Sequence, residues 1–132
     1  MTFTLTPEGE SFVTDRHLAT FSTIGPGGLI HAVAVGFTLA DGVVRIITRG
    51  GSQKVRNVER SGLATVAQVA GPRWISFAGH ARVTRDPEEI AHAVARYAVR
   101  YREPRPHPER VAIELVPQRV LASAGLLRSS DA

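Results

Sequence analysis

The sequence has no cysteine among its 132 residues. This absence excludes disulfide bonds, a thiolate nucleophile and zinc or iron–sulfur sites built on cysteine. It also lacks any apolar run near the roughly 18 residues that a membrane-spanning helix requires. Its first residues, MTFTLTPEGE, have neither the basic nor the apolar segment of a signal peptide. We therefore expect a cytoplasmic protein without a membrane partner.

Several kinds of catalytic group are missing as well. The five histidines are scattered, without the paired spacing of metal ligands, so no metal site is expected. No serine lies in a nucleophile elbow, and no pair of carboxylates indicates acid–base catalysis, so the catalytic residues are unknown at this level. An enzyme with so few reactive side chains often relies on a cofactor for its chemistry.

Acidic residues are in the minority, with 12 Asp and Glu against 16 Lys and Arg and a formal net charge of +4. A basic protein favours anionic partners such as phosphorylated ligands, polycarboxylates or nucleic acid. The same charge also suits a solvated, arginine-rich surface. The candidate helices carry apolar stripes suited to packing, not the features of a recognition helix, so we expect no nucleic-acid partner.

Hydrophobic periodicity and turn residues predict a single domain over residues 1–132. Six strands are expected at residues 17–24, 29–37, 43–48, 63–70, 74–83 and 110–122, the last bent near Pro117. Helices are expected at residues 6–15, 52–61 and 86–102, and residues 128–132 are expected to be frayed. The turn at residues 40–42 predicts that strands 29–37 and 43–48 form a hairpin. This order indicates a mostly β protein of the α+β class, with an antiparallel barrel or sandwich and a few helices.

The stretch TRGGSQKVRN contains Lys54, the only lysine of the chain. It leaves a strand, passes two glycines and enters a helix, where free N–H groups bind anions. Ser52 adds a hydroxyl group and Lys54 a flexible positive charge. The stretch is therefore either a phosphate site or a capped helix with a solvated basic face. Its spacing matches neither a Walker A loop nor a Rossmann fingerprint.

Two further features have two interpretations each. Ala32, Ala34 and Gly36 form a face of small side chains, which suits either a flat ring lying on the strand or close packing against a helix. Trp74, the only tryptophan, either stacks on a planar ligand or anchors the core or a dimer interface.

The succession HAVAVGF, VRIITRGGSQKVRN, RSGLATVAQVAGPRWISFAGHARV, RYAVRYREPRP and RVAIELVPQRVL resembles the pyridoxamine 5'-phosphate oxidase-like superfamily of flavin and deazaflavin oxidoreductases, over residues 6–127. Within it, GGSQK, RSGLA and GPRW are most similar to small bacterial reductases that use coenzyme F420. The resemblance implies a six-stranded split β-barrel of the FMN-binding type and a homodimer with cofactor sites between subunits. It also implies hydride transfer from reduced F420 to a conjugated acceptor, with biliverdin, a linear tetrapyrrole, as the expected substrate. An FMN-dependent oxidoreductase of the same fold and a non-catalytic cofactor-binding protein remain as alternatives.

The resemblance also implies which residues bind the cofactor. The ring system would lie along His31, Ala32, Val33, Ala34 and Val35. The phosphate side would be formed by Thr48, Gly51, Ser52, Gln53, Lys54 and Asn57, and the segment Gly71, Pro72, Arg73 and Trp74 would border the cofactor. Gln53 stands where the family has an arginine, which argues against a standard FMN oxidase. Arg49, Arg56 and Arg60 would complete a positive rim.

Overall fold

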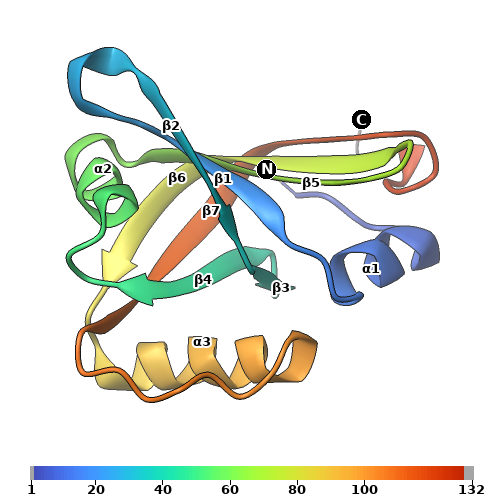
Figure 1. The fold of residues 1–132 in the computed structure, drawn as a ribbon. Helices are drawn as coiled ribbons and strands as arrows, with labels where there is room; N and C mark the ends of the chain where they lie inside the picture. The colour runs from blue at the N-terminus through green and yellow to red at the C-terminus, as the bar shows by residue number, and fades with distance from the viewer. Residues whose placement is uncertain (1, 130–132) are drawn as a thin grey trace.

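The computed structural model describes residues 2–129, so residues 130–132 of the expected frayed tail lie outside the described part. Its seven strands form one antiparallel sheet in the order β2-β1-β5-β6-β7-β4-β3 (Figure 1). They are β1 (Ala19–Ile24), β2 (Ile30–Val35), β3 (Thr38–Ala40), β4 (Val43–Arg49), β5 (Leu63–Ala70), β6 (Arg73–Thr84) and β7 (Arg110–Ala122). The mostly β, antiparallel character predicted from the sequence is confirmed. The count of six strands is wrong, because the structure has seven.

The extra strand arises where the expected strand 29–37 ends early. β2 stops at Val35, and β3 begins at Thr38 after the two linking residues Gly36 and Phe37. β2 pairs with β1, across the turn that contains Gly25–Gly28, and β3 pairs with β4. The predicted hairpin therefore forms only between β3 and β4.

The two edges of the sheet come close together without closing it. β2 and β3 are the two edge strands, yet only Gly36 and Phe37 separate them along the chain. Because one residue extends the chain by at most about 3.5 Å, the edges must approach at this point. The sheet is thus a barrel that stays open between β2 and β3, and one side of it encloses the core around Phe21, Phe37 and Phe77.

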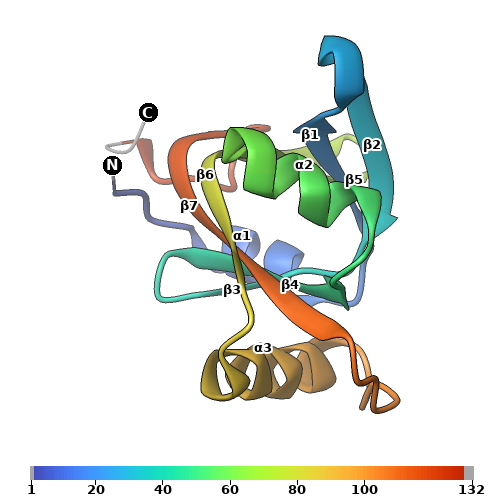
Figure 2. The ribbon, with the colours of Figure 1, turned by 90° about the vertical axis from the view of Figure 1, so that its left-hand side faces the viewer.

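Three helices pack against this sheet (Figure 2). They are α1 (Pro7–Thr14), α2 (Gln53–Ser61) and α3 (Pro87–Arg100), and a 3-10 turn, η1, spans Pro26–Gly28. As the sequence predicts, Thr6 caps α1 and Asp86 caps α3, each accepting a hydrogen bond from a backbone N–H at 3.0 Å. Among residues 2–129, no helix is long and apolar enough to cross a membrane.

Arg100, at the end of α3, ties this helix to the sheet. Its buried guanidinium donates hydrogen bonds to the carbonyl of Asp15 at 2.9 Å, the carbonyl of Phe37 at 2.6 Å and the Gln68 amide oxygen at 2.7 Å. These acceptors lie before β1, between β2 and β3, and on β5. One side chain therefore ties the end of α3 to three separate parts of the chain, including the link between the two edge strands.

Candidate functional site

A cavity of about 340 Å³ lies where β2 and β4 meet the start of α2. The ends of β2 and β4, the helices α2 and α3, and the segment before β7 all contribute to its wall. Its lining residues are Ala34, Val35, Gly36, Ile47, Thr48, Arg49, Lys54, Tyr97, Pro104, His107 and Arg110. The structure therefore brings together Ala34, Val35, Thr48 and Lys54 from the predicted set, and Arg49 from the predicted rim.

No side chain caps the first turn of α2. Ser52 is the N-cap residue but its hydroxyl makes no capping bond; it donates instead to the carbonyl of Arg49 at 2.9 Å. The first turn also has no acidic side chain, unlike those of α1 and α3. The positive end of the helix dipole, beside Lys54, is therefore not neutralised by any side chain of this turn.

The cavity is strongly cationic. Arg49, Lys54 and Arg110 line it, and none of its lining residues is a carboxylate. Burial lowers the pKa of Lys54, and the neighbouring Arg49 lowers it further. Both effects disfavour the charged form of the lysine in the free protein, and the opposite charge of an anionic ligand would offset them.

Four predicted or candidate residues on α2 form a network of their own. The Gln53 amide donates to Asn57 Oδ1 at 2.7 Å and accepts from Arg56 at 2.8 Å. Asn57 is fully buried and donates to the Thr23 hydroxyl at 3.0 Å. Arg56 also donates to the carbonyl of Gly51, and Arg60 donates to Asn57 and to the carbonyl of Ile24. Gln53 and Asn57 do not line the cavity; they fix the start of α2 against β1.

The predicted ring-binding strand is divided between two faces. Ala32 and Ala34 are exposed on the outer face of β2, whereas His31 and Val33 are half-buried on the opposite face and Val35 is buried. Among these five predicted residues only Ala34 and Val35 reach the cavity. The small-residue face is nevertheless open, and no helix packs on Ala32 or Ala34 closely enough to bury them.

The segment Gly71–Trp74 lies at the opposite end of the sheet. Gly71 and Pro72 form the exposed turn between β5 and β6, eight residues or about 26 Å along β5 from the end of α2. The Trp74 N–H donates a hydrogen bond to the Ser123 hydroxyl, and the Trp74 carbonyl accepts one from the Ser123 N–H. Arg73 lies over the ring of Phe12 at 4.9 Å. Within one chain this segment does not border the cavity, and neither do Gly51 and Ser52.

Gly36, which the sequence offered as part of a small-residue face, also lines the cavity. Five lining residues were not predicted from the sequence as ligand contacts: Ile47, Tyr97, Pro104, His107 and Arg110. Arg110 is the most informative of them, because it pairs directly with Arg49 across β4 and β7. That pairing joins segments about sixty residues apart, so only the strand register could have revealed it. Among residues 2–129 no group of His, Asp and Glu is placed to hold a metal ion.

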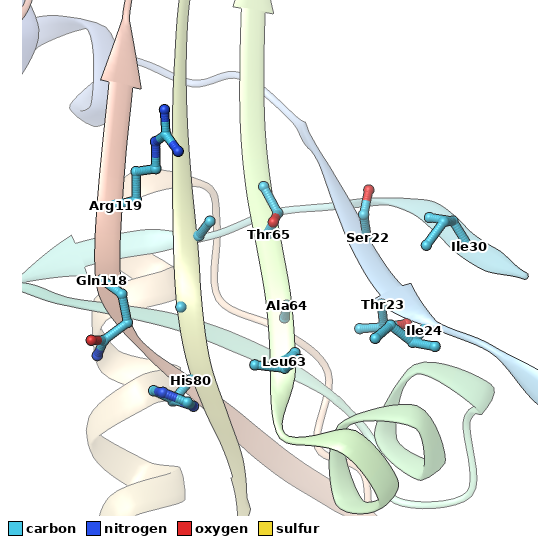
Figure 3. A pocket seen from close by; sticks show the side chains of 12 residues that line it. Ser22, Thr23, Ile24, Ile30, Leu63, Ala64, Thr65, His80, Gln118 and Arg119 are labelled. Atoms are coloured by element: carbon cyan, nitrogen blue, oxygen red, sulfur yellow. The ribbon is translucent and has the colours of Figure 1, made fainter. Parts of the chain in front are cut away.

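A second hollow, of about 560 Å³, lies on the outer face of the sheet, the side of β2, β1, β5, β6 and β7 turned away from the core (Figure 3). Cross-strand pairing places Leu63, His80 and Val116 together on this face, and likewise Val69 with Trp74. Figure 3 shows Gln118 and Arg119 on one side of the hollow and Ser22 and Ile30 on the other. Large apolar side chains are exposed around it: Ile30, Leu63, Val69, Trp74, Val116 and Leu121.

The family model for pyridoxamine 5'-phosphate oxidase matches residues 5–124 of the chain, which is nearly its whole length. The chain belongs to the pyridoxamine 5'-phosphate oxidase family. This family assignment agrees with the resemblance seen in the sequence. It covers every strand and helix described above, including all cavity-lining residues.

Within the pyridoxamine 5'-phosphate oxidase family, the chain is 48% identical over 125 residues to a protein of Mycobacterium tuberculosis (strain CDC 1551 / Oshkosh) named F420H(2)-dependent biliverdin reductase. The match covers 93% of this chain and 91% of that protein. Among solved structures, a conserved hypothetical protein from Mycobacterium tuberculosis superposes with a TM-score of 0.78 at 24% identity, covering 91% of this chain and 85% of that one. A structure titled F420 reductase superposes with a TM-score of 0.72 at 22% identity, covering 88% and 98%. At these identities the structural likeness establishes the fold alone.

Proposed function

We propose that this chain is an oxidoreductase that uses reduced coenzyme F420 to reduce biliverdin to bilirubin. The observation that carries the proposal is the 48% identity, over nearly all of both chains, to a protein named as an F420H(2)-dependent biliverdin reductase. Such an enzyme needs a site for an anionic, ring-bearing cofactor, and the cationic cavity beside α2 supplies one. We further propose that residues 1–132 act as one cytoplasmic domain, which the absence of cysteine supports.

The residues present fit the cofactor's phosphate group. Lys54 and the uncapped first turn of α2 would hold the phosphate, with Thr48 and Arg49 at the end of β4 beside them. The exposed small side chains of Ala32 and Ala34 leave room for a flat ring on the outer face of β2. When bound, the reduced deazaflavin would supply the hydride; the chain's own residues bind and orient it.

The proposal includes a homodimer. The outer face of the sheet carries six exposed large apolar side chains, although a solvated antiparallel face is normally polar. A second copy packed against this face would cover them. It would also bring the partner's copy of the Gly71–Trp74 segment toward a cavity that, within one chain, that segment cannot reach.

The cofactor distinguishes this proposal from the FMN-dependent alternative, which the family as a whole keeps open. Purified protein should bind F420 more tightly than FMN in an equilibrium titration followed by the fluorescence of Trp74. Lys54→Ala should weaken F420 binding by about 1.5–3 kcal/mol, which is typical for losing a charge-assisted contact. Tight binding of FMN with no binding of F420 would refute the proposal, and unchanged affinity in Lys54→Ala would show that the phosphate lies elsewhere.

Activity is tested by anaerobic mixing of the protein with reduced F420 and a panel of acceptors that includes biliverdin. We expect the absorbance of oxidised F420 to return with biliverdin. If another conjugated acceptor reacts instead, the substrate assignment is wrong and the cofactor assignment stands. If the protein binds reduced F420 but no acceptor oxidises it, the protein is a cofactor carrier.

A further inference from the structure

Tyr97 is the one residue of α3 among those that line the cofactor cavity. It lies four residues before Tyr101 on the same face of the helix, and the two rings are 4.8 Å apart with a 32° tilt. The pair packs against the link between β2 and β3, so both tyrosines stand at the opening of the barrel.

The two hydroxyl groups have different surroundings. The Tyr101 hydroxyl accepts a hydrogen bond from the Phe37 N–H at 3.1 Å and donates to the carbonyl of His17 at 2.7 Å. Burial raises the pKa of Tyr101. The hydroxyl of Tyr97, which is half-buried, makes no hydrogen bond with any of the described residues. Tyr101 therefore has a structural role, whereas the polar group of Tyr97 is unused by the fold.

The ring of Tyr97 is nevertheless held in place. A Cβ atom added at Gly36 would lie 3.0 Å from Cε2 of Tyr97 and 3.0 Å from Cε2 of Tyr101. The backbone at Gly36 thus packs directly on both rings, and Tyr101 supports Tyr97 from the side. A fixed ring with a free hydroxyl group is preorganised for a ligand, because binding then orders little.

Among the cavity-lining side chains, the Tyr97 hydroxyl finds no charged group that could accept a hydrogen bond. Arg49, Lys54 and Arg110 are donors only, and no carboxylate lines the cavity. A ligand that these cations hold carries anionic oxygens. We propose that Tyr97 is a binding residue of the cofactor site, and that its hydroxyl donates a hydrogen bond to an anionic oxygen of the bound cofactor. This inference rests on the proposed function of the cavity.

The test compares Tyr97→Phe with Tyr101→Phe, since each variant loses one hydroxyl group from the same stacked pair. We expect Tyr97→Phe to raise the Kd for F420 and the KM for reduced F420 about 5- to 20-fold, as the loss of one such hydrogen bond predicts. Its kcat and thermal midpoint should stay near those of the wild type. Tyr101→Phe should lower the thermal midpoint and leave the Kd within about twofold.

An unchanged Kd in Tyr97→Phe would overturn the inference, and so would equal weakening in both variants, which would indicate ring packing alone. If the wild type binds FMN and not F420, the proposed function fails and the same comparison is made with FMN. If it binds neither, both proposals fail. Should Tyr97→Phe fold poorly, Tyr97→His, which keeps a ring donor, must bind the cofactor more tightly than Tyr97→Leu; equal affinity would overturn the inference.

Discussion

At the scale of single residues, Lys54 is placed where its charge is unfavourable to the free protein. Burial and Arg49 both lower its pKa below the ordinary value of 10.5. Between the lowered pKa and 10.5 the unfolded chain binds more protons than the folded one, so stability rises with pH in that window. Below it, the folded state keeps a constant penalty for the charged lysine. The charged form of Lys54 is disfavoured in the free protein, among other cations, and a bound anion would stabilise it.

The first prediction follows from this penalty. Lys54→Met should leave the free energy of unfolding at pH 7 unchanged or slightly raised, because it removes a disfavoured charge. The same variant should lose cofactor affinity. Urea unfolding and a cofactor titration measure the two effects, and a clear loss of stability would show that Lys54 serves the fold.

The second prediction concerns pH. The Kd for F420 should be level near neutral pH and should rise at a pH below 10.5, as Lys54 loses its proton in the free protein. In Lys54→Arg the guanidinium stays charged throughout, so that rise should be absent. The two proteins share every other titrating group, and their difference therefore isolates Lys54. Parallel profiles would contradict the assignment.

Burial lowers the pKa of Arg100 as it does that of Lys54, yet Arg100 serves the fold. It is buried and has three neutral acceptors in place of a carboxylate. Arg100→Ala should lower the free energy of unfolding by about 3–5 kcal/mol, because three acceptors around the barrel opening lose their donor. Arg100→Lys should recover only part, since an ammonium cannot match the planar fork. Denaturant unfolding of both variants tests this, and a loss below about 1 kcal/mol in Arg100→Ala would contradict it.

At the scale of elements, local signals predicted every helix and the approximate place of most strands. The caps Thr6 and Asp86, the turn at Gly25–Gly28 and the period of α3 are all readable within a few residues. The division of the expected strand 29–37 was not readable, because it depends on Tyr97 and Tyr101 packing against Gly36 from sixty residues away. Tertiary packing of that kind leaves no local pattern in the strand itself.

The pairing of β6 with β7 leaves no room for a side chain at Gly79. β6 and β7 shift register between Ala78 and Gly79, opposite Pro117. A Cβ at Gly79 would lie 2.2 Å from the carbonyl oxygen of Val116 and 2.8 Å from the N atom of Gln118. Gly79→Ala should therefore destabilise the protein by at least about 2 kcal/mol, measured by thermal or urea unfolding. Ala78→Gly is the matched control. Equal stability of the wild type and Gly79→Ala would show that β6 and β7 shift enough to make room for the added methyl group.

At the scale of the whole molecule, the cavity is assembled from five parts of the chain: the ends of β2 and β4, the helices α2 and α3, and the segment before β7. The sequence identified the first three, around Ala34, Thr48 and Lys54, because their residue types and spacing are local. Tyr97, His107 and Arg110 reach the cavity only because β7 pairs with β4 and the segment after α3 leads back to that strand. The family resemblance placed Asn57 among the cofactor-binding residues, whereas its burial and its hydrogen bonds give it a structural role.

The proposed dimer is tested by placing a charge on the outer face. Leu121, which is 45% exposed, pairs with Ser76 on that face, whereas Val99, 88% exposed, lies on α3 away from it. Wild type and Val99→Arg should sediment as dimers. Leu121→Arg should sediment as a monomer, because the two-fold axis of such a dimer would place two buried arginines in one interface, and it should also lose cofactor affinity. If the wild type is a monomer and still binds F420 tightly, the cofactor site is not formed between two subunits.

The proposed hydride transfer is tested most directly by following the transferred hydrogen. Biliverdin is mixed anaerobically with the protein and F420 that is reduced and fully deuterated at C5, and the product is examined by mass spectrometry and NMR. Direct transfer from F420 predicts bilirubin with one deuterium at its central bridge carbon. Bilirubin without that deuterium, or no bilirubin from a protein that binds F420, would contradict the proposed function.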